Sequence, residues 1–220
     1  MTKYLKECQS VIDSAQWLLS QGYFGPELGT AGNVSVRIEG EEFIAITPSG
    51  IPYQDLLPDD ISIVDYDQKM ISGNHHPSVE VGMHLGVYRT REDVGAVAHT
   101  HQPYASILSV INEPIPPLFD DITMALGGII DVVPYALSGS PELVEKVVKV
   151  ITNGCQAFIM QNHGALCLGA TIKKATKNVA FLEKVAHVYY HALATGKPIS
   201  EIPKDKVEML YSFSKTKESI

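Results

Sequence analysis

The sequence predicts an α/β fold in which a mixed or antiparallel sheet carries helices on both faces. Two observations predict it: strand-like apolar runs alternate with amphipathic helical patterns, and two of the strand patterns adjoin across a short polar turn as a hairpin. The 220 residues suffice for one domain with a substantial core, and nothing resembling a linker divides them. We therefore expect residues 1–220 to form a single domain.

The elements can be assigned in chain order from periodicity and stop signals. Apolar residues at three- and four-residue spacing from Leu5 to a stop at Gly22 predict the first helix, and strands at 33–38 and 43–47 form the hairpin. Further along, we expect strands at 61–65, 94–98, 129–133 and 157–160. Helices are expected at 79–88, 103–110 and 122–126, and two longer helices from Pro141 to about Thr152, with Ser140 as N-cap, and from about Thr171 to Gly196.

Composition narrows the functional classes. Charged residues make up 19% of the chain, below the roughly 25% of an average soluble domain, so part of the surface is expected to be an oligomer interface. A net charge of −8 disfavours a nucleic-acid partner. The odd set Cys8, Cys155 and Cys167 lacks C-x-x-C spacing and indicates buried thiols in a reducing compartment.

No membrane or secretory segment is expected. No apolar run approaches the roughly 18 residues of a membrane helix, and charged and apolar side chains alternate at the start of the chain. These patterns predict a cytoplasmic protein.

The most informative segment is His99-Thr100-His101, which follows the apolar run 94–98 at the end of a predicted strand. Side chains at i and i+2 of a strand share a face, so both imidazoles should leave the sheet together. His163 follows a second apolar run and precedes Gly164, and could supply the third protein ligand that a catalytic zinc requires. The pattern predicts a metal site, against the alternative of hydrogen-bonded strand histidines.

A carboxylate completes the set. Glu80 should lie in the first turn of the helix at 79–88, where Ser78 can cap. His84, one turn further, could also point toward the site, but we interpret it as a supporting or structural residue because three histidines fill the usual count. His187 and His191, at i and i+4 of the last helix, are expected in packing or surface roles.

Together, four groups of motifs resemble the class II aldolase/adducin family, and the likeness extends over nearly the whole chain. They are the segments Gly29–Ser35, Ile46–Gly50 and Pro77–Glu80, and His99–His101 taken with Gln161–Gly164. The motifs are most similar to those of the fuculose-phosphate aldolase members. Each alone is a weak signal, whereas their order along one chain is specific.

The resemblance implies a three-layer α/β/α fold with a mostly antiparallel central sheet, and a homotetramer with active sites at subunit interfaces. It also implies a divalent metal, one Zn2+ per subunit or another divalent ion, held by His99, His101 and His163. In the family's aldolases the glutamate that corresponds to Glu80 ligates the resting metal, or stands beside it and acts as base.

The turns at Gly32-Asn33 and Ser49-Gly50, together with Ser78, can be interpreted in two ways. They are ordinary turn residues, or their amides and hydroxyls cradle a phosphate near a helix start. The resemblance implies a substrate-phosphate site at Gly32, Asn33, Ser49, Gly50, Ser78 and Val79. Val79 replaces a second serine of the fuculose-phosphate aldolases, so one hydroxyl donor is missing and the need for phosphate stays open.

The departing aldehyde requires a second acid/base, which in the family comes from a neighbouring subunit. By motif position the candidate is Asp121, in a region where the epimerase members use an aspartate. Equally, Asp120 can be the N-cap of the short helix and Asp121 its first acidic residue. Tyr211 could supply the family's second tyrosine.

The predicted function is that of a zinc-dependent aldolase. It would cleave a small ketose or ketose 1-phosphate into dihydroxyacetone, or its phosphate, and an aldehyde through a metal-stabilised enediolate. A ribulose-phosphate 4-epimerase-like epimerase, or a decarboxylase or dehydratase that uses the same enolate chemistry, is the alternative. A non-enzymatic interaction module like the adducin head is a third possibility, against which the retention of Glu80 and the three histidines argues.

Overall fold

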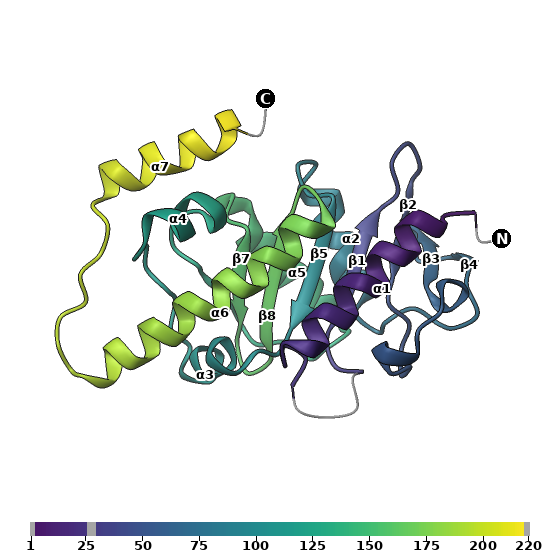
Figure 1. Cartoon of the computed structure of the whole chain (residues 1–220), viewed down its shortest axis with the longest axis horizontal. Helices are drawn as coiled ribbons and strands as arrows, with labels where there is room; N and C mark the ends of the chain where they lie inside the picture. Colours follow the sequence, from purple (N-terminus) through teal and green to yellow (C-terminus); the bar gives the residue numbers. More distant parts are fainter. Residues whose placement is uncertain (1–2, 26–29, 218–220) are drawn as a thin grey trace.

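A computed structural model describes residues 3–25 and 30–217, and its centre is an eight-stranded sheet between two layers of helices (Figure 1). The order across the sheet is β4-β3-β2-β1-β5-β8-β7-β6, and every neighbouring pair is antiparallel except β6 and β7. The strands are β1 (Asn33–Arg37), β2 (Phe43–Ile46), β3 (Ser62–Asp65), β4 (Met70–Ser72), β5 (Ala96–Thr100), β6 (Val132–Val133), β7 (Ala157–Met160) and β8 (Gly164–Gly169).

Helices cover both faces of this sheet. In Figure 1, α1 and α6 cross in front of the strands, while α2 and α5 lie behind them. The helices are α1 (Leu5–Ser20), α2 (Val81–Thr90), α3 (Pro103–Ile111), α4 (Asp120–Leu126), α5 (Pro141–Val150), α6 (Ile172–Ala194) and α7 (Lys204–Lys217), with 3-10 turns at Tyr53–Asp55, Pro58–Asp60 and Ile151–Asn153.

Two apolar cores explain why the layers pack. One core joins α1, α3, α4 and α6 to the front of the sheet, with Val11, Leu108 and Val179 fully buried. The other joins α2 and α5 to the back, with Leu85 and Val147 fully buried. Apolar side chains on both faces of the central strands therefore leave water on folding, which is the main favourable term. The predicted three-layer, mostly antiparallel α/β/α fold is confirmed.

Most predicted elements form, and the differences have local causes. The helix predicted at 79–88 begins at Val81, because Glu80 itself occupies the N-cap. The strand predicted at 129–133 shortens to β6, since Ile130 pairs instead with Ile115 in an isolated bridge. Strands β4 and β8 and helix α7 were not predicted. Gly29, at the start of the first predicted motif, lies outside the described residues.

The prediction of buried thiols is confirmed, since Cys8, Cys155 and Cys167 are all buried and free. Within residues 3–25 and 30–217, no helix combines the length and the apolar character that crossing a bilayer would need.

Candidate active site

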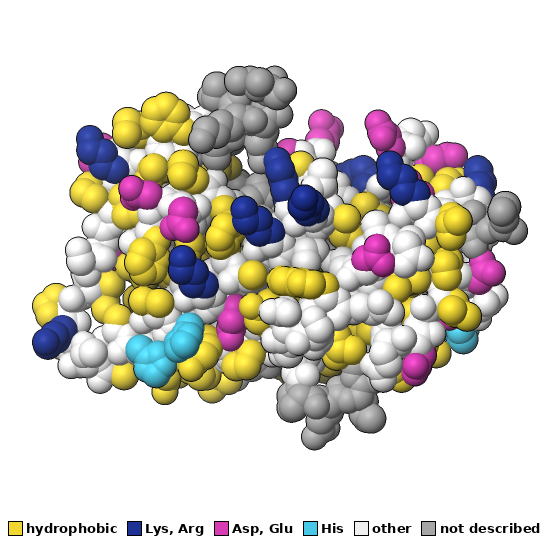
Figure 2. All heavy atoms as spheres, viewed as in Figure 1, with side chains coloured by type: hydrophobic (Ala, Val, Ile, Leu, Met, Phe, Trp, Pro, Cys, Tyr) yellow, Lys and Arg dark blue, Asp and Glu magenta, His cyan; other side chains and the backbone are white. Residues whose placement is uncertain are grey.

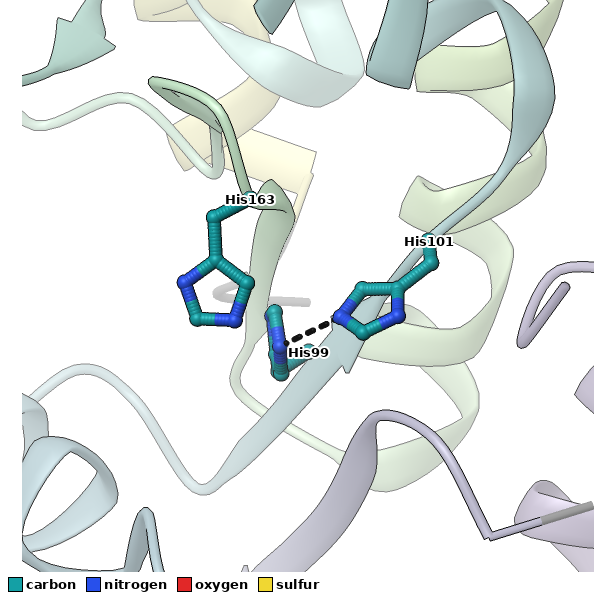
Figure 3. Close-up of side chains that lie close together, drawn as sticks. All are labelled: His99, His101 and His163. Atoms are coloured by element: carbon teal, nitrogen blue, oxygen red, sulfur yellow. Dashed lines mark hydrogen bonds between the residues drawn. The ribbon is translucent and has the colours of Figure 1, made fainter. Parts of the chain in front are cut away.

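Three imidazoles converge at one end of the sheet (Figure 3). His99 lies in β5, the strand between β1 and β8, and His101, two residues after His99, directly follows the strand on the same face. His163 comes from the turn that joins β7 and β8. The Nε2 atoms of His99 and His101 are 3.0 Å apart, and one nitrogen from each of the three rings lies within 4.8 Å of the others. The predicted trio is therefore brought together within the described chain.

The turn at His163 depends on two special backbone positions. Asn162 has a positive φ of 53°, a conformation that asparagine tolerates better than most residues. At Gly164 an added Cβ would lie 2.4 Å from the Thr100 carbonyl oxygen and 2.6 Å from His101 Cδ2. Glycine thus allows β8 to approach β5 closely enough for His163 to face the other two rings.

A hydrogen bond sets the orientation of His99. Its Nδ1 lies 2.9 Å from the carbonyl oxygen of Ala165, an acceptor, so Nδ1 carries the proton. In the neutral ring Nε2 then presents a lone pair, which faces His101 Nε2 and, at 3.2 Å, Glu80 Oε2. Fixing the tautomer of a metal-ligating histidine through its other nitrogen is a recurrent feature of metal sites.

The donor set fits a divalent cation. Ligand atoms about 2.1 Å from a tetrahedral zinc are about 3.4 Å from one another, close to the 3.0 Å between the Nε2 atoms of His99 and His101 and to the 3.2 and 3.3 Å that separate Glu80 from His99 and His163. Burial, reinforced by the neighbouring His99 ring, lowers the pKa of His101 to about 3 and of His163 to about 4. Both rings are therefore neutral near pH 7, which is the form that binds metal.

Glu80 closes the cluster from the N-terminus of α2. It is 4% exposed, with Oε2 3.2 Å from His99 Nε2 and Oε1 3.3 Å from His163 Nε2. The Asn33 amide and the Ser138 hydroxyl each donate to one of its oxygens over 2.8 Å.

These contacts keep the carboxyl ionised. Burial alone would raise the pKa of Glu80, but interaction with His99, the Asn33 hydrogen bond, interaction with His163 and the Ser138 hydrogen bond outweigh it and lower the pKa to about 2. Glu80 is thus a carboxylate at neutral pH, able to accept a proton or to ligate a cation.

The predicted turns gather beside Glu80. Pro48 and Pro77 pair in an antiparallel bridge, which brings the exposed turn Ser49-Gly50 against Ser78. Asn33 Nδ2 also donates to Ser78 Oγ over 3.0 Å, which links the first motif to the third. At Gly32 an added Cβ would meet the His99 carbonyl oxygen at 2.5 Å, so glycine at that position allows close packing under the histidine cluster. Val79 is 69% exposed.

The candidates for a second acid/base occupy other parts of this chain. Asp121 lies in the first turn of α4, half exposed and 3.7 Å from Lys184. The alternative N-cap assignment for Asp120 was wrong, because Phe119 caps α4 and Asp120 is its first residue. The Tyr211 hydroxyl donates to the Gly154 carbonyl oxygen.

Two further observations bear on the predicted residues. Ser138 was missed, since an exposed serine in the loop before α5 gives no local signal that it reaches Glu80.

His187 and His191 are exposed, and histidine side chains lie at the surface over the C-terminal half of α6 (Figure 2). The His187 ring stacks on Tyr104 with centroids 3.9 Å apart, which agrees with the packing and surface roles expected for this pair.

Comparisons with known proteins agree with this geometry. A sequence profile described as "Class II Aldolase and Adducin N-terminal domain" matches residues 9–190. The chain is 34% identical to the 5-methylthioribulose-1-phosphate/5-deoxyribulose-1-phosphate aldolase of Rhodospirillum rubrum, over 94% of this chain and 90% of that one. It is 33% identical to an L-fuculose phosphate aldolase of Escherichia coli O6:H1, over 96% and 95%.

Solved structures show the same fold. An L-fuculose 1-phosphate aldolase superposes with a TM-score of 0.88 at 30% identity, covering 96% of each chain. YgbL from Escherichia coli, titled a putative aldolase/epimerase/decarboxylase, superposes with a TM-score of 0.82 at 26% identity, covering 94% of this chain and 98% of that one.

Proposed function

Because the chain belongs to the class II aldolase and adducin family and is an aldolase lyase, we propose that it cleaves a ketose 1-phosphate into dihydroxyacetone phosphate and an aldehyde, using one Zn2+ per subunit. The observation that carries the proposal is the convergence of three histidine nitrogens, all within 4.8 Å of one another, with the buried Glu80 carboxylate 3.2 Å from His99 Nε2 and 3.3 Å from His163 Nε2. The named aldolase relatives act on phosphorylated ketoses, which supports this substrate class.

His99, His101 and His163 are the residues that would hold the metal, with Glu80 as a fourth ligand or beside it. When bound, the cation polarises the substrate carbonyl and stabilises the negative charge of the enediolate left by carbon–carbon bond cleavage.

Glu80 is the proposed base in the synthetic direction. Its carboxylate removes a proton from the hydroxymethyl carbon next to the carbonyl of dihydroxyacetone phosphate, and in the cleavage direction it returns a proton to that carbon. The low pKa keeps Glu80 in the form that accepts the proton. Its two hydrogen-bond donors, Asn33 and Ser138, hold the carboxylate in place while the proton moves.

The substrate phosphate is proposed to bind among Gly32, Asn33, Ser49, Gly50 and Ser78, beside Val79. Ser78 Oγ already accepts from Asn33 Nδ2 and from the Glu80 amide, so its own proton can be donated to a ligand. In the exposed Ser49-Gly50 turn the Ser49 hydroxyl and the Gly50 amide are the further donors, since the Ser49 amide already donates to the His76 carbonyl oxygen. The hydrophobic Val79 leaves this cradle with fewer hydroxyl donors than a serine there would provide.

A second acid/base must accept the proton of the hydroxyl group that becomes the aldehyde. Asp121 is our candidate, contributed by a neighbouring subunit of a homotetramer. Its half-exposed carboxylate on α4 is available to another chain. We further propose that residues 1–220 act as one domain in each subunit.

The test incubates the zinc-loaded protein with 5-deoxyribulose 1-phosphate and with fuculose 1-phosphate. Release of dihydroxyacetone phosphate together with an aldehyde, in proportion to the zinc quantified in the same preparation, is the expected result. The same sugars without phosphate measure how far turnover depends on the phosphate group. Absence of aldehyde release from every ketose 1-phosphate offered would rule out this activity.

An epimerase or decarboxylase is the second candidate, favoured by the likeness to YgbL and by an aspartate at position 121. Product analysis separates them, since an epimerase inverts the ketose without releasing aldehyde and a decarboxylase releases carbon dioxide.

A further inference from the structure

A row of buried polar side chains runs away from Glu80 between α2 and β1. We name it the polar ladder; it consists of Asn33, Ser35, Glu80, His84 and Tyr88, all at most 4% exposed. Glu80, His84 and Tyr88 follow one another at intervals of four residues, from the N-cap of α2 along the helix. Asn33 and Ser35 are two residues apart in β1. Four helical residues rise about 6.0 Å and two strand residues about 6.6 Å, so the two series stay in step.

The contacts of the polar ladder form one continuous chain. Asn33 Nδ2 is 2.8 Å from Glu80 Oε2, and Asn33 Oδ1 is 2.5 Å from His84 Nε2. His84 Nδ1 is 2.6 Å from Ser35 Oγ, which is 2.7 Å from the Tyr88 hydroxyl. The ladder therefore connects the carboxylate of the active site to a tyrosine two helical turns away.

The chemistry of the groups fixes the direction of every bond. A carboxylate only accepts, so the Asn33 amide must turn its nitrogen to Glu80 and its oxygen to His84. That oxygen also only accepts, so His84 Nε2 must carry a proton and donate it. In the neutral ring Nδ1 then accepts from Ser35, whose oxygen in turn accepts from Tyr88.

Burial supports these protonation states. It lowers the pKa of His84 to about 3, which keeps the ring neutral, and it raises the pKa of the Tyr88 phenol, which keeps its proton. A buried histidine with an acceptor on one side and a donor on the other has one low-energy tautomer. The proton arrangement is thus determined along the whole ladder.

We propose that His84 is a positioning residue, whose Nε2–H locks the Asn33 amide with its nitrogen toward Glu80 and so keeps the carboxylate aimed at the histidine cluster. Without this donor, the Asn33 amide could rotate by half a turn and place its oxygen against the carboxylate. Two acceptors would then face each other, and Glu80 would lose a charge-assisted hydrogen bond. This inference rests on the proposed function for its kinetic consequence, but not for the state of His84.

The first test needs no turnover. The metal-free wild-type protein, labelled with 15N-histidine, is examined by long-range proton–nitrogen correlation, and the signal of His84 is assigned by its loss in His84→Gln. A neutral Nε2–H tautomer near pH 7 is expected. An Nδ1–H tautomer or a charged ring would overturn the proposal. Failure to turn over a ketose 1-phosphate would instead count against the proposed function alone.

The second test compares His84→Gln with His84→Leu. Glutamine carries an amide N–H near the position of the imidazole Nε2 and can still donate to Asn33, whereas leucine cannot. We expect His84→Leu to lower kcat by roughly 10- to 100-fold at nearly unchanged KM and full zinc content, and His84→Gln to stay within about threefold of wild type. His187→Leu, at an exposed position of α6, is the control for histidine removal. Equal losses in the two His84 variants would show that the ring only fills space.

Discussion

Replacing Gly164 with alanine tests whether the contact between β5 and β8 builds the histidine cluster. The added Cβ would lie 2.4 Å from the Thr100 carbonyl oxygen and 2.6 Å from His101 Cδ2, about 1 Å inside ordinary van der Waals contact. Neither neighbour is a flexible chain end, since one is backbone and the other is a ring of the cluster. Strand separation and the position of His101 must therefore change together.

The size of the effect follows from the overlap. Overpacking of this kind costs about 1–3 kcal/mol, which for a chain of this length lowers Tm by roughly 2–12 °C. Displacing His101 should also weaken zinc binding by about 10- to 100-fold. Differential scanning fluorimetry of the metal-free protein and competition with a zinc chelator measure the two quantities separately.

The matched control is Gly82→Ala in α2, whose Cβ would meet its nearest neighbour, Val144 Cγ2, at an ordinary 3.6 Å. This variant should be as stable as wild type or up to about 1 kcal/mol more stable, because alanine favours helix. Wild-type Tm and zinc affinity in Gly164→Ala would refute the argument that this strand contact shapes the cluster.

Three other predictions address the site directly. His99→Ala and His163→Ala should each lose bound zinc and turnover while remaining folded, and wild-type turnover by either would contradict the ligand assignment. Glu80→Gln should keep zinc but slow solvent exchange of the dihydroxyacetone phosphate α-proton by about 100-fold or more, and an unchanged exchange rate would remove Glu80 from that role. Acid should destabilise the metal-free protein. The pKa values of His101 and His163 are about 3 and about 4 in the folded protein, below the value of about 6.5 in the unfolded chain. The stability that these neutral rings contribute is therefore fully present above about pH 6.5 and declines as the pH falls. A Tm that stays constant between about pH 7.5 and 5 would contradict it.

The histidine cluster was predictable because strand periodicity is local information. Two histidines at i and i+2 after an apolar run must share a face, and His163 ends a run of the same kind. The cap of α5 was equally readable: Ser140 accepts from the Leu143 amide, and Pro141 opens the helix, as the sequence predicted.

Other features depend on contacts that the sequence does not encode locally. The segment Gly164–Gly169 has glycine at both ends and little β-branching, yet it forms the fully buried strand β8 because β5 and β7 pair with it on either side. The Ser138 contact requires the loop before α5 to fold back over Glu80. Of the polar ladder, the sequence indicated only that His84 lies one turn beyond Glu80, and the bonds of the ladder appear only when α2 packs on β1.

Because His99 and His101 project on one face of the sheet and strand side chains alternate between faces, an odd change in the number of residues before them reverses the face on which they lie. Deleting a single residue between Val94 and Ala98 would transfer both rings to the opposite side of the sheet, away from His163, whereas point substitutions there leave their direction intact. We expect one-residue deletions in this strand to abolish zinc binding, which deletion scanning with zinc quantification measures. Zinc retained after a one-residue deletion would refute the argument. In strand β5 the number of residues before His99, rather than their identity, therefore sets the side of the sheet on which the two rings lie.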